Sequence, residues 1–257
     1  MVNYDVIGNI VIVKFGREEK KKTKKFWAEK FLKEHKQVKT VLEKESKFSG
    51  RLRTQKTKYL AGEKTKEALH KENNCAFRLN VDTCYFSPRL SAERKEIASM
   101  VKKNQSVLVL FGGVAPFAII IAKSSGAKKV VSVELGRECS KYAKENARRN
   151  KVEKVVEIIQ GDVNKVLPKM KEKFDRIIMA RPQLKDTFLA PTLKKIKKGG
   201  IVYYYGFYPL EEKQKMLEEI KSEALSAGKK IKILKTKKAG EIGYKKFRWR
   251  VDFKILN

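Results

Sequence analysis

The sequence has few of the residues that bind metal ions and no segment that resembles a membrane span. Its 257 residues include three cysteines and two histidines, and Cys75, Cys84 and Cys139 have no CxxC spacing. We therefore expect structural thiols and no metal site. No apolar run reaches the roughly 18 residues of a membrane helix, and no signal-peptide pattern opens the chain. These absences predict a soluble, cytoplasmic protein.

Acidic residues are scarce relative to basic ones. The 61 Lys and Arg residues outnumber 29 Asp and Glu residues, which leaves a formal net charge of +32. A charge of this size predicts a polyanionic partner. Residues 17–35 combine many lysines with apolar residues at helical spacing, which predicts a basic amphipathic helix. Its lysines could face phosphates or only solvent, and the pattern leaves both readings open.

The chain divides into two predicted domains, residues 1–86 and 87–257. In the first, residues 4–14 predict a hairpin around Gly8 and Asn9, and residues 38–86 predict short strands, so we expect a small α+β domain. A helix over 87–103 follows, with Ser87 as its cap and Pro88 in its first turn. Beyond it, strand and helix patterns alternate, which predicts a mainly parallel sheet with helices on both faces. The last segment predicts two long strands that pair as an antiparallel hairpin at one sheet edge.

The turn "FGGVAPF" at residues 111–117 marks a candidate ligand site. In doubly wound sheets, ligands approach the turn after the first strand. Glu134 ends the next strand pattern 21 residues after Gly113 and could accept both ribose hydroxyls, while Asp162 ends the following one and could accept an adenine amino group. A tight turn without a ligand remains the alternative. Because neither GxGxxG nor GK[ST] is present, the pattern points to S-adenosylmethionine.

Several motifs resemble those of the tRNA (guanine-37-N1) methyltransferases of archaea and eukaryotes, a family that includes wyosine-pathway enzymes. The motifs are "GRLRTQKTKYLAGEKTKEALHKEN", "YFSPRLSAERKEIA" and "FGGVAPFAI", and the resemblance extends from about residue 4 to the end. It implies a class I, Rossmann-like methyltransferase fold with a seven-stranded sheet, preceded by a small α+β domain that binds tRNA. The family usually carries a further N-terminal domain, which we expect this chain to lack.

The resemblance also implies the site residues. Glu93 matches the proposed general base that removes the N1 proton of the target guanine, and Arg53 matches the arginine that stabilises charge on O6. The alternatives are a surface Glu93 paired with Arg89, and a plain phosphate contact for Arg53. The residues that the resemblance places around the cofactor are Tyr85, Phe86, Arg89, Arg94, Phe111, Gly112, Gly113, Val114, Glu134, Leu135, Asp162, Val163, Ala180 and Pro182. For Tyr85 and Phe86, packing between the domains is the alternative.

Three positions depart from the family pattern. Val109 replaces an acid in the first sheet strand, Ala115 replaces a glycine, and Ala180 replaces the asparagine of an Asn-Leu-Pro motif. The last departure fits the archaeal branch that also methylates C7 of 4-demethylwyosine to give isowyosine. The competing hypotheses are an aminocarboxypropyl transferase of the same superfamily and a non-catalytic RNA-binding protein. We expect the substrate to be the tRNA anticodon stem-loop and the protein to be a monomer.

Overall fold

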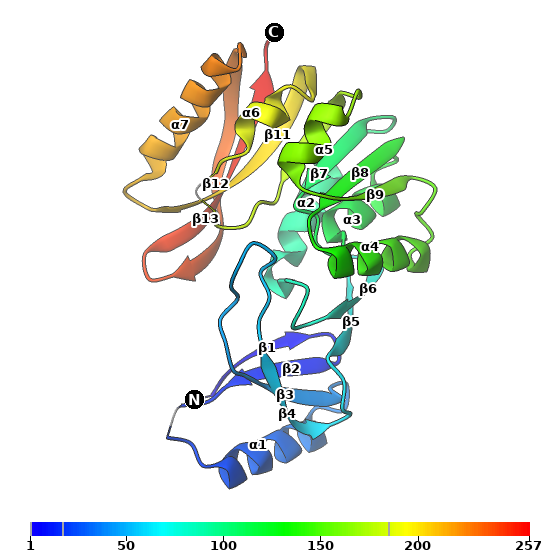
Figure 1. The fold of residues 1–257 in the computed structure, drawn as a ribbon, viewed down its shortest axis with the longest axis vertical. Coiled ribbons are helices and arrows are strands. Elements are labelled where there is room, and N and C mark those ends of the chain that lie inside the picture. Colours follow the sequence, from blue (N-terminus) through cyan, green and yellow to red (C-terminus); the bar gives the residue numbers. More distant parts are fainter. Residues whose placement is uncertain (1, 17, 185) are drawn as a thin grey trace.

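The computed structural model describes residues 2–16, 18–184 and 186–257, and its two parts lie one above the other along the long axis of the molecule (Figure 1). The N-terminal part is a four-stranded sheet in the order β1-β2-β3-β4, with one helix. Strands β2 and β3 are parallel, and the other two pairs are antiparallel. The elements are β1 (Asn3–Ile7), β2 (Ile10–Lys14), α1 (Lys21–Glu34), β3 (Thr40–Lys44) and β4 (Thr57–Gly62).

The two faces of this first sheet have different neighbours because side chains alternate along each strand. Val11 and Val13 of β2 pack under α1, against Ala28 and Phe31, in a small core of their own. Ile10, Ile12 and other residues of the opposite face join a core that continues into the C-terminal part. The two parts are therefore held together by continuous apolar packing.

A two-stranded hairpin connects the two parts. It consists of β5 (Glu67–Glu72) and β6 (Cys75–Asn80). Two asparagines bind its free edge: Asn146 lies in helix α4 (Arg137–Arg149), and Asn150 directly follows that helix. The side-chain amide of Asn146 bonds both backbone groups of Arg78, and that of Asn150 bonds both backbone groups of Ala76, at 2.7–3.0 Å. This hairpin lies before residue 86 in the sequence but packs on the C-terminal part. The domain boundary at residue 86 stays a prediction.

The C-terminal part is a seven-stranded sheet in the order β12-β13-β11-β10-β7-β8-β9. Strands β7 to β11 are parallel, and β12 and β13 form the antiparallel edge hairpin that the sequence predicts. The elements are η1 (Pro88–Leu90), α2 (Ser91–Met100), β7 (Ser106–Leu110), α3 (Pro116–Ser124), β8 (Lys129–Glu134), α4 (Arg137–Arg149), β9 (Val156–Gln160), α5 (Val163–Lys169), β10 (Phe174–Met179), α6 (Leu189–Leu193), β11 (Ile196–Pro209), α7 (Lys213–Ser226), β12 (Ile231–Gly243) and β13 (Lys246–Ile255).

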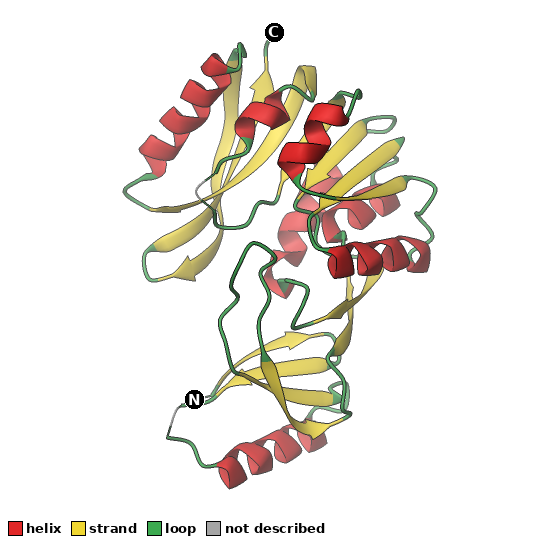
Figure 2. Ribbon diagram, in the orientation of Figure 1, coloured by secondary structure: helices red, strands yellow, loops and turns green. Residues whose placement is uncertain are grey.

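Helices cover both faces of this sheet (Figure 2). The central strand β7 is apolar throughout because it is buried on both sides. Val107 and Val109 belong to the core under α2, α3 and α4, whereas Leu108 and Leu110 belong to the core under α5, α6 and α7. The predicted α/β class with a mainly parallel seven-stranded sheet is confirmed.

The local prediction at the start of the second domain needs correction. The segment predicted as one helix over 87–103 begins as a 3₁₀ turn at Pro88–Leu90, and α2 spans Ser91–Met100. The Ser87 side chain makes no capping hydrogen bond, because the 3₁₀ turn separates it from the first turn of α2. Among the described residues, no helix is both long and apolar enough to cross a membrane.

Candidate active site at the carboxyl ends of the parallel strands

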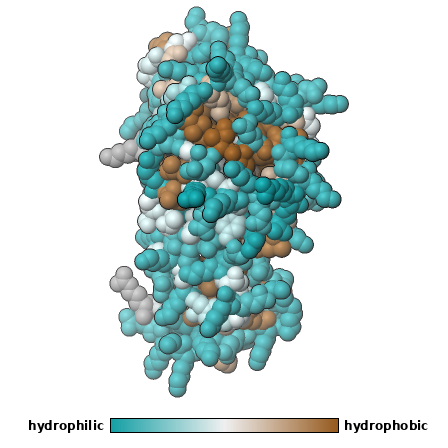
Figure 3. All heavy atoms as spheres, turned by 45° about the vertical axis from the view of Figure 1, so that its right-hand side comes forward, coloured by the Kyte–Doolittle hydropathy of each residue, from teal (hydrophilic) through white to brown (hydrophobic). Residues whose placement is uncertain are grey.

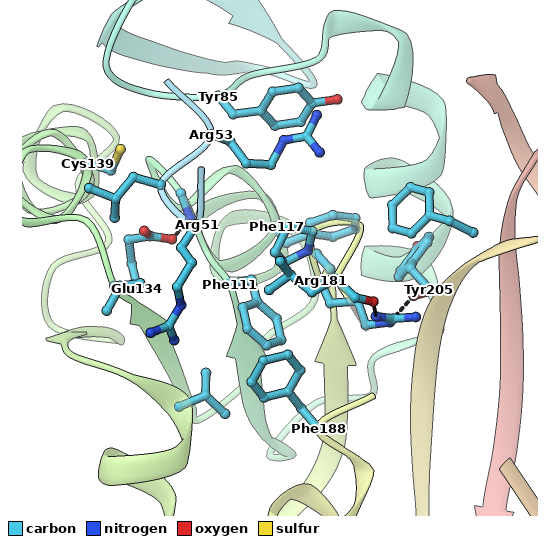
Figure 4. Close-up of a pocket in the computed structure, with 18 of the residues that line it drawn as sticks. Arg51, Arg53, Tyr85, Phe111, Phe117, Glu134, Cys139, Arg181, Phe188 and Tyr205 are labelled. Carbon is cyan, nitrogen blue, oxygen red and sulfur yellow. Dashed lines mark hydrogen bonds between the residues drawn. The ribbon is translucent and has the colours of Figure 1, made fainter. Parts of the chain in front are cut away.

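One cavity lies where the carboxyl ends of the parallel strands meet a long loop of the N-terminal part (Figure 4). The loop joins β3 to β4 and rises toward the second sheet (Figure 1). The cavity opens to solvent, and its empty volume of about 1010 Å³ includes the open space at its mouth. The predicted site residues that line it are Arg53, Tyr85, Phe111, Gly113, Glu134, Leu135, Asp162, Val163, Ala180 and Pro182.

The turn after β7 brings backbone close to the cavity. Phe111, Gly113 and Ala115 have φ angles of 61°, 56° and 64°, so three of its residues adopt the left-handed conformation. The N–H of Gly112 donates to the Val133 carbonyl at 3.0 Å, and a Cβ on Gly112 would lie 2.1 Å from Ser132 Oγ. A side chain there would force the Ser132 hydroxyl to move, whereas Ser132 Cβ and the Val133 carbonyl oxygen would remain at contact distances of 3.5 and 3.7 Å. Gly112 therefore supports the turn from behind.

Glu134 ends β8 and lines the cavity wall beside this turn. Its Oε2 accepts a hydrogen bond from the Gly113 N–H at 2.8 Å, and its Oε1 accepts one from the Gly136 N–H at 2.7 Å. Burial raises the pKa of this carboxyl, and the two backbone donors oppose that shift. Each carboxylate oxygen keeps a further lone pair. Glu134 can therefore accept hydroxyl protons from a ligand without releasing the turn.

Asp162 follows β9 and caps helix α5 through its bond with the Asn164 N–H. Its Oδ2 also accepts a hydrogen bond from Arg51 Nη2 at 2.6 Å, which crosses from the β3–β4 loop to the C-terminal part. This bond lowers the pKa of Asp162. Arg51 thus occupies the carboxylate for which the sequence predicts an adenine contact.

Arg53 and Tyr85 form the opposite wall of the cavity and stack on one another (Figure 4). The guanidinium carbon of Arg53 lies 4.4 Å from the centre of the Tyr85 ring and 5.8 Å from that of Phe48. Arg53 also has a positive φ of 51°, which is uncommon for a residue with a side chain. Among the described residues, its buried Nε has no hydrogen-bond partner. The aromatic rings therefore position a guanidinium whose donors remain available to a ligand.

Glu93 does not line the cavity. It is 6% exposed, and its Oε1 accepts hydrogen bonds from Tyr205 Oη at 2.8 Å and Arg250 Nη1 at 2.6 Å. Lys237 Nζ lies 2.8 Å from its Oε2. The alternative of a surface glutamate paired with Arg89 is wrong, because Arg89 turns outward and pairs with Asp5.

Besides Gly112, which supports the turn from behind, four further predicted residues also lie outside the cavity. Arg94 is buried in a two-point ion pair with Glu72, and its guanidinium lies 5.0 Å from the centre of the Phe86 ring. Phe86 is itself buried against Phe77 and His70. Val114 is fully buried in the core. These side chains, and the exposed Arg89, stabilise the junction between the two parts, so their predicted cofactor contacts remain untested.

Ala180 lines the cavity directly after β10, and the next residue shapes the loop beyond it. The Arg181 guanidinium is buried and donates to the carbonyl oxygens of Tyr205, Leu184 and Asp186 at 2.9–3.0 Å. The first of these bonds is drawn in Figure 4. Because one side chain bonds three carbonyls, the loop after Ala180 is held against β11.

The cavity contains residues that the sequence reasoning missed. They are Arg51, Leu52, Leu90, Phe117, Cys139, Arg181, Leu184, Phe188, Tyr205, Phe207 and Arg248. Three of them had a sequence signal. Arg51 shares the "GRLR" motif with Arg53, and Tyr205 and Phe207 lie two residues apart, which places them on the same face of one strand. Within the described part of the chain, no cluster of His, Cys, Asp and Glu could hold a metal ion.

Comparisons with known proteins agree with this geometry. Residues 68–234 match the family described as the TRM5/TYW2 methyltransferase domain, and residues 2–65 match the TYW2 N-terminal domain. Trm5b of Pyrococcus abyssi, a tRNA (guanine(37)-N(1))-methyltransferase, is 34% identical over 254 residues, which cover 98% of this chain and 74% of the relative. A crystal structure of Trm5b from that organism has a TM-score of 0.88, with coverage of 99% of this chain and 75% of that one.

A second relative covers the whole length of both chains. Taw22 of Nanoarchaeum equitans, a tRNA (guanine(37)-N(1))/4-demethylwyosine(37)-methyltransferase, is 32% identical over 305 aligned positions, with coverage of 99% of this chain and 100% of the relative. The solved complex of aTrm5 with tRNALeu has a TM-score of 0.84 at 26% identity and covers 99% of this chain and 72% of that one.

Proposed function

The chain belongs to the TRM5/TYW2 methyltransferase family, and from this premise we propose that it transfers a methyl group from S-adenosylmethionine to N1 of guanosine 37 in tRNA. One observation carries the proposal. The cavity brings Gly113, Glu134 and Asp162 on one wall together with Arg53 and Tyr85 on the other. The first wall suits an adenosine, and the second suits a guanine base.

The cofactor wall fits an adenosine in shape and in hydrogen-bonding chemistry. The glycine turn allows close approach to the backbone, and Glu134 offers the acceptors that a ribose diol needs. When bound, S-adenosylmethionine supplies an electrophilic methyl group. An adenine amino group that binds Asp162 would compete with Arg51, which now bonds that carboxylate. Arg51 would then be released beside the RNA.

The base wall fits a guanine that has left its stack in the anticodon loop. The Tyr85 ring offers a stacking surface, and the Arg53 guanidinium could stabilise the negative charge that develops on O6 as N1 loses its proton. A cation held by aromatic rings is suited to this role, and within the described part of the chain the Arg53 Nε has no hydrogen-bond partner that would compete with a ligand.

The direct test is incubation of the protein with labelled cofactor and a tRNA transcript that carries guanosine 37, followed by mass analysis of the nucleosides. The proposed function predicts 1-methylguanosine at position 37. A product heavier by an aminocarboxypropyl group would instead favour that transferase activity, and cofactor binding without any product would favour a non-catalytic RNA-binding protein. We further propose that the protein works in the cytoplasm as a monomer and without a metal ion.

A second substrate, 4-demethylwyosine, is favoured by the small side chain of Ala180 at the cavity wall. The absence of an amide leaves room for a tricyclic base. We expect Ala180→Asn to shift the ratio of products toward 1-methylguanosine by about tenfold or more, since added bulk and an unmatched polar group each discriminate by about 1–3 kcal/mol. Product mass on two tRNAs, one with guanosine and one with 4-demethylwyosine, measures the ratio.

The control for this change is Ala92→Asn on the exposed face of α2, which should leave the ratio unchanged. If the original protein gives no product from the tricyclic tRNA but normal N1 methylation of the other, the dual-substrate proposal fails and the simple guanosine enzyme remains.

We expect tRNA binding to weaken steeply with salt because of the net charge of +32. Hydrophilic side chains cover most of the face drawn in Figure 3, over both parts of the molecule. If the protein contacts about five phosphates, its affinity should fall by about 10²-fold between about 50 and 200 mM salt, since each contact releases counterions. Filter binding at several salt concentrations measures the slope, and a flat slope would contradict a phosphate-binding role.

The same salt dependence can be measured for variants of the exposed lysines of α1, which tests whether this helix contacts the tRNA phosphates. Replacing Lys22, Lys25 and Lys33 together with glutamine should lower the salt slope if they face phosphates. An unchanged slope would show that these lysines face only solvent, the alternative that the sequence leaves open.

A further inference from the structure

The buried network around Glu93 contacts the cavity through a tyrosine. Tyr205, on β11, lines the cavity, whereas Glu93 lies outside it. The two side chains are joined by the 2.8 Å hydrogen bond from Tyr205 Oη to Glu93 Oε1. Both are buried, with exposed fractions of 2% and 6%. Tyr205 is therefore the residue of the pair that lines the cavity.

The remaining contacts of Glu93 are with two cations, Arg250 and Lys237. Arg250, which is completely buried, donates to Oε1, and Lys237 lies against Oε2. Arg250 also binds Glu96 and Asp252, and Lys237 also binds Glu96. Direct contact between Glu93 and a base in the cavity would require this network to break. Breaking a buried ion pair is costly, because the charges left behind are desolvated.

We propose that Tyr205 relays the N1 proton of the target guanine to Glu93. The inference rests on the proposed function. As N1 forms its bond to the methyl group, the bond from that carbon to the sulfonium sulfur would break and its electron pair would stay on the departing thioether. The N1–H bond breaks in the same step, and its proton passes to Tyr205 Oη. The proton that Tyr205 already carries passes along the existing hydrogen bond to Glu93 Oε1. Tyrosine is neutral before and after the step, and the carboxylate becomes a neutral carboxylic acid.

The surroundings of Tyr205 suit this role. Burial raises the pKa of its hydroxyl, and the adjacent Glu93 carboxylate raises it further, so the resting side chain keeps the proton that the relay needs. Its backbone carbonyl accepts a hydrogen bond from Arg181 Nε at 3.0 Å, and its ring lies 6.1 Å from that of Phe117, centre to centre. These contacts hold the ring in place at the cavity wall.

The first test compares Tyr205→Phe with Tyr203→Phe. Tyr203 lies on the same strand and is 1% exposed, and its hydroxyl accepts a hydrogen bond from Arg176 away from the cavity. Tyr203→Phe therefore removes a buried hydroxyl just as Tyr205→Phe does, but at a position outside the cavity. In single-turnover reactions at saturating cofactor and tRNA, the relay predicts a loss of about 10²-fold for Tyr205→Phe. The dissociation constants for tRNA and cofactor should stay within about twofold of the original, and Tyr203→Phe should keep the original rate.

The double variant Tyr205→Phe/Glu93→Gln tests whether the two residues serve one path. The relay predicts that the double variant reacts about as slowly as the slower single variant, because either change interrupts the same proton path. Independent roles predict that the two losses multiply. Multiplied losses would overturn the relay.

A measurement on the unaltered protein does not depend on whether the variants fold. Two protons move together in the relay, so the single-turnover rate should vary in a curved manner with the fraction of D₂O, whereas one moving proton gives a straight line. A straight line would overturn the relay. So would a Tyr205→Phe variant that is as active as the unaltered protein. In either case the proposed methyl transfer would still stand. An original protein that forms no 1-methylguanosine would overturn the proposed function, and the relay with it.

Discussion

Replacing Glu93 with glutamine is expected to slow methyl transfer by about 10²-fold or more while cofactor and tRNA binding persist, the scale of a lost general base. The reason is that an amide cannot take up the N1 proton, whether it arrives directly or through Tyr205. Single-turnover rates and equilibrium binding on the same preparation separate the two effects. An unchanged rate would remove Glu93 from the mechanism.

The chain offers a close control in Glu96. It lies three residues further along α2 and binds the same two cations, Arg250 and Lys237. Hydrogen bonds from Arg250 and the two lysines around it lower its pKa, so Glu96→Gln also removes a negative charge from the network. Because Glu96 has no bond to Tyr205 among the described residues, Glu96→Gln should keep the transfer rate. Equal losses in both variants would indicate that the network's structure, and not the proton on Glu93, limits the reaction.

Replacing Glu134 with alanine is expected to weaken cofactor binding by about 10- to 100-fold, because hydrogen bonds to a charged group contribute about 1.5–3 kcal/mol. The substitution removes two sets of hydrogen bonds, and both losses weaken cofactor binding. The ribose would lose its acceptors, and the N–H groups of Gly113 and Gly136 would lose the carboxylate that orders the turn. Titration calorimetry with S-adenosylmethionine measures the dissociation constant, and transfer at saturating cofactor should recover most of the original rate.

Glu138→Ala is the control for that variant. Glu138 lies four residues further on, is exposed in the first turn of α4, and does not line the cavity. It should bind the cofactor normally. A normal dissociation constant for Glu134→Ala would place the cofactor elsewhere.

The sequence predicts that Gly113, Glu134 and Asp162 lie close together because they stand at the ends of consecutive strands. Glu134 ends β8, Gly113 and Asp162 follow β7 and β9, and parallel strands end at the same edge of a sheet. Their convergence in one cavity follows from topology that alternation of strands and helices already implies. The sheet and its edge hairpin were predictable for a related reason, since periodicity is a local property of the chain.

The base wall was only partly predictable. Arg53 was expected from its motif, but its orientation depends on Tyr85 and Phe48, which the chain brings beside it from other segments. The contact between Arg51 and Asp162 joins residues 111 positions apart. No local pattern encodes such a contact, because it exists only when the N-terminal part packs against the second sheet.

The sequence by itself determined which backbone elements form, since glycines permit the tight turns and alternating apolar side chains bury both faces of each central strand. The tertiary structure alone decided where the side chain of Glu93 lies and which residues it contacts. Glu93 sits in a motif that suggests a side chain in the active site, yet Arg250, 157 residues away, binds it within the interior. A buried carboxylate must find cations and donors wherever the fold places them. Glu93 is therefore held away from the cavity wall, and its hydrogen-bond partner Tyr205 lines the cavity instead.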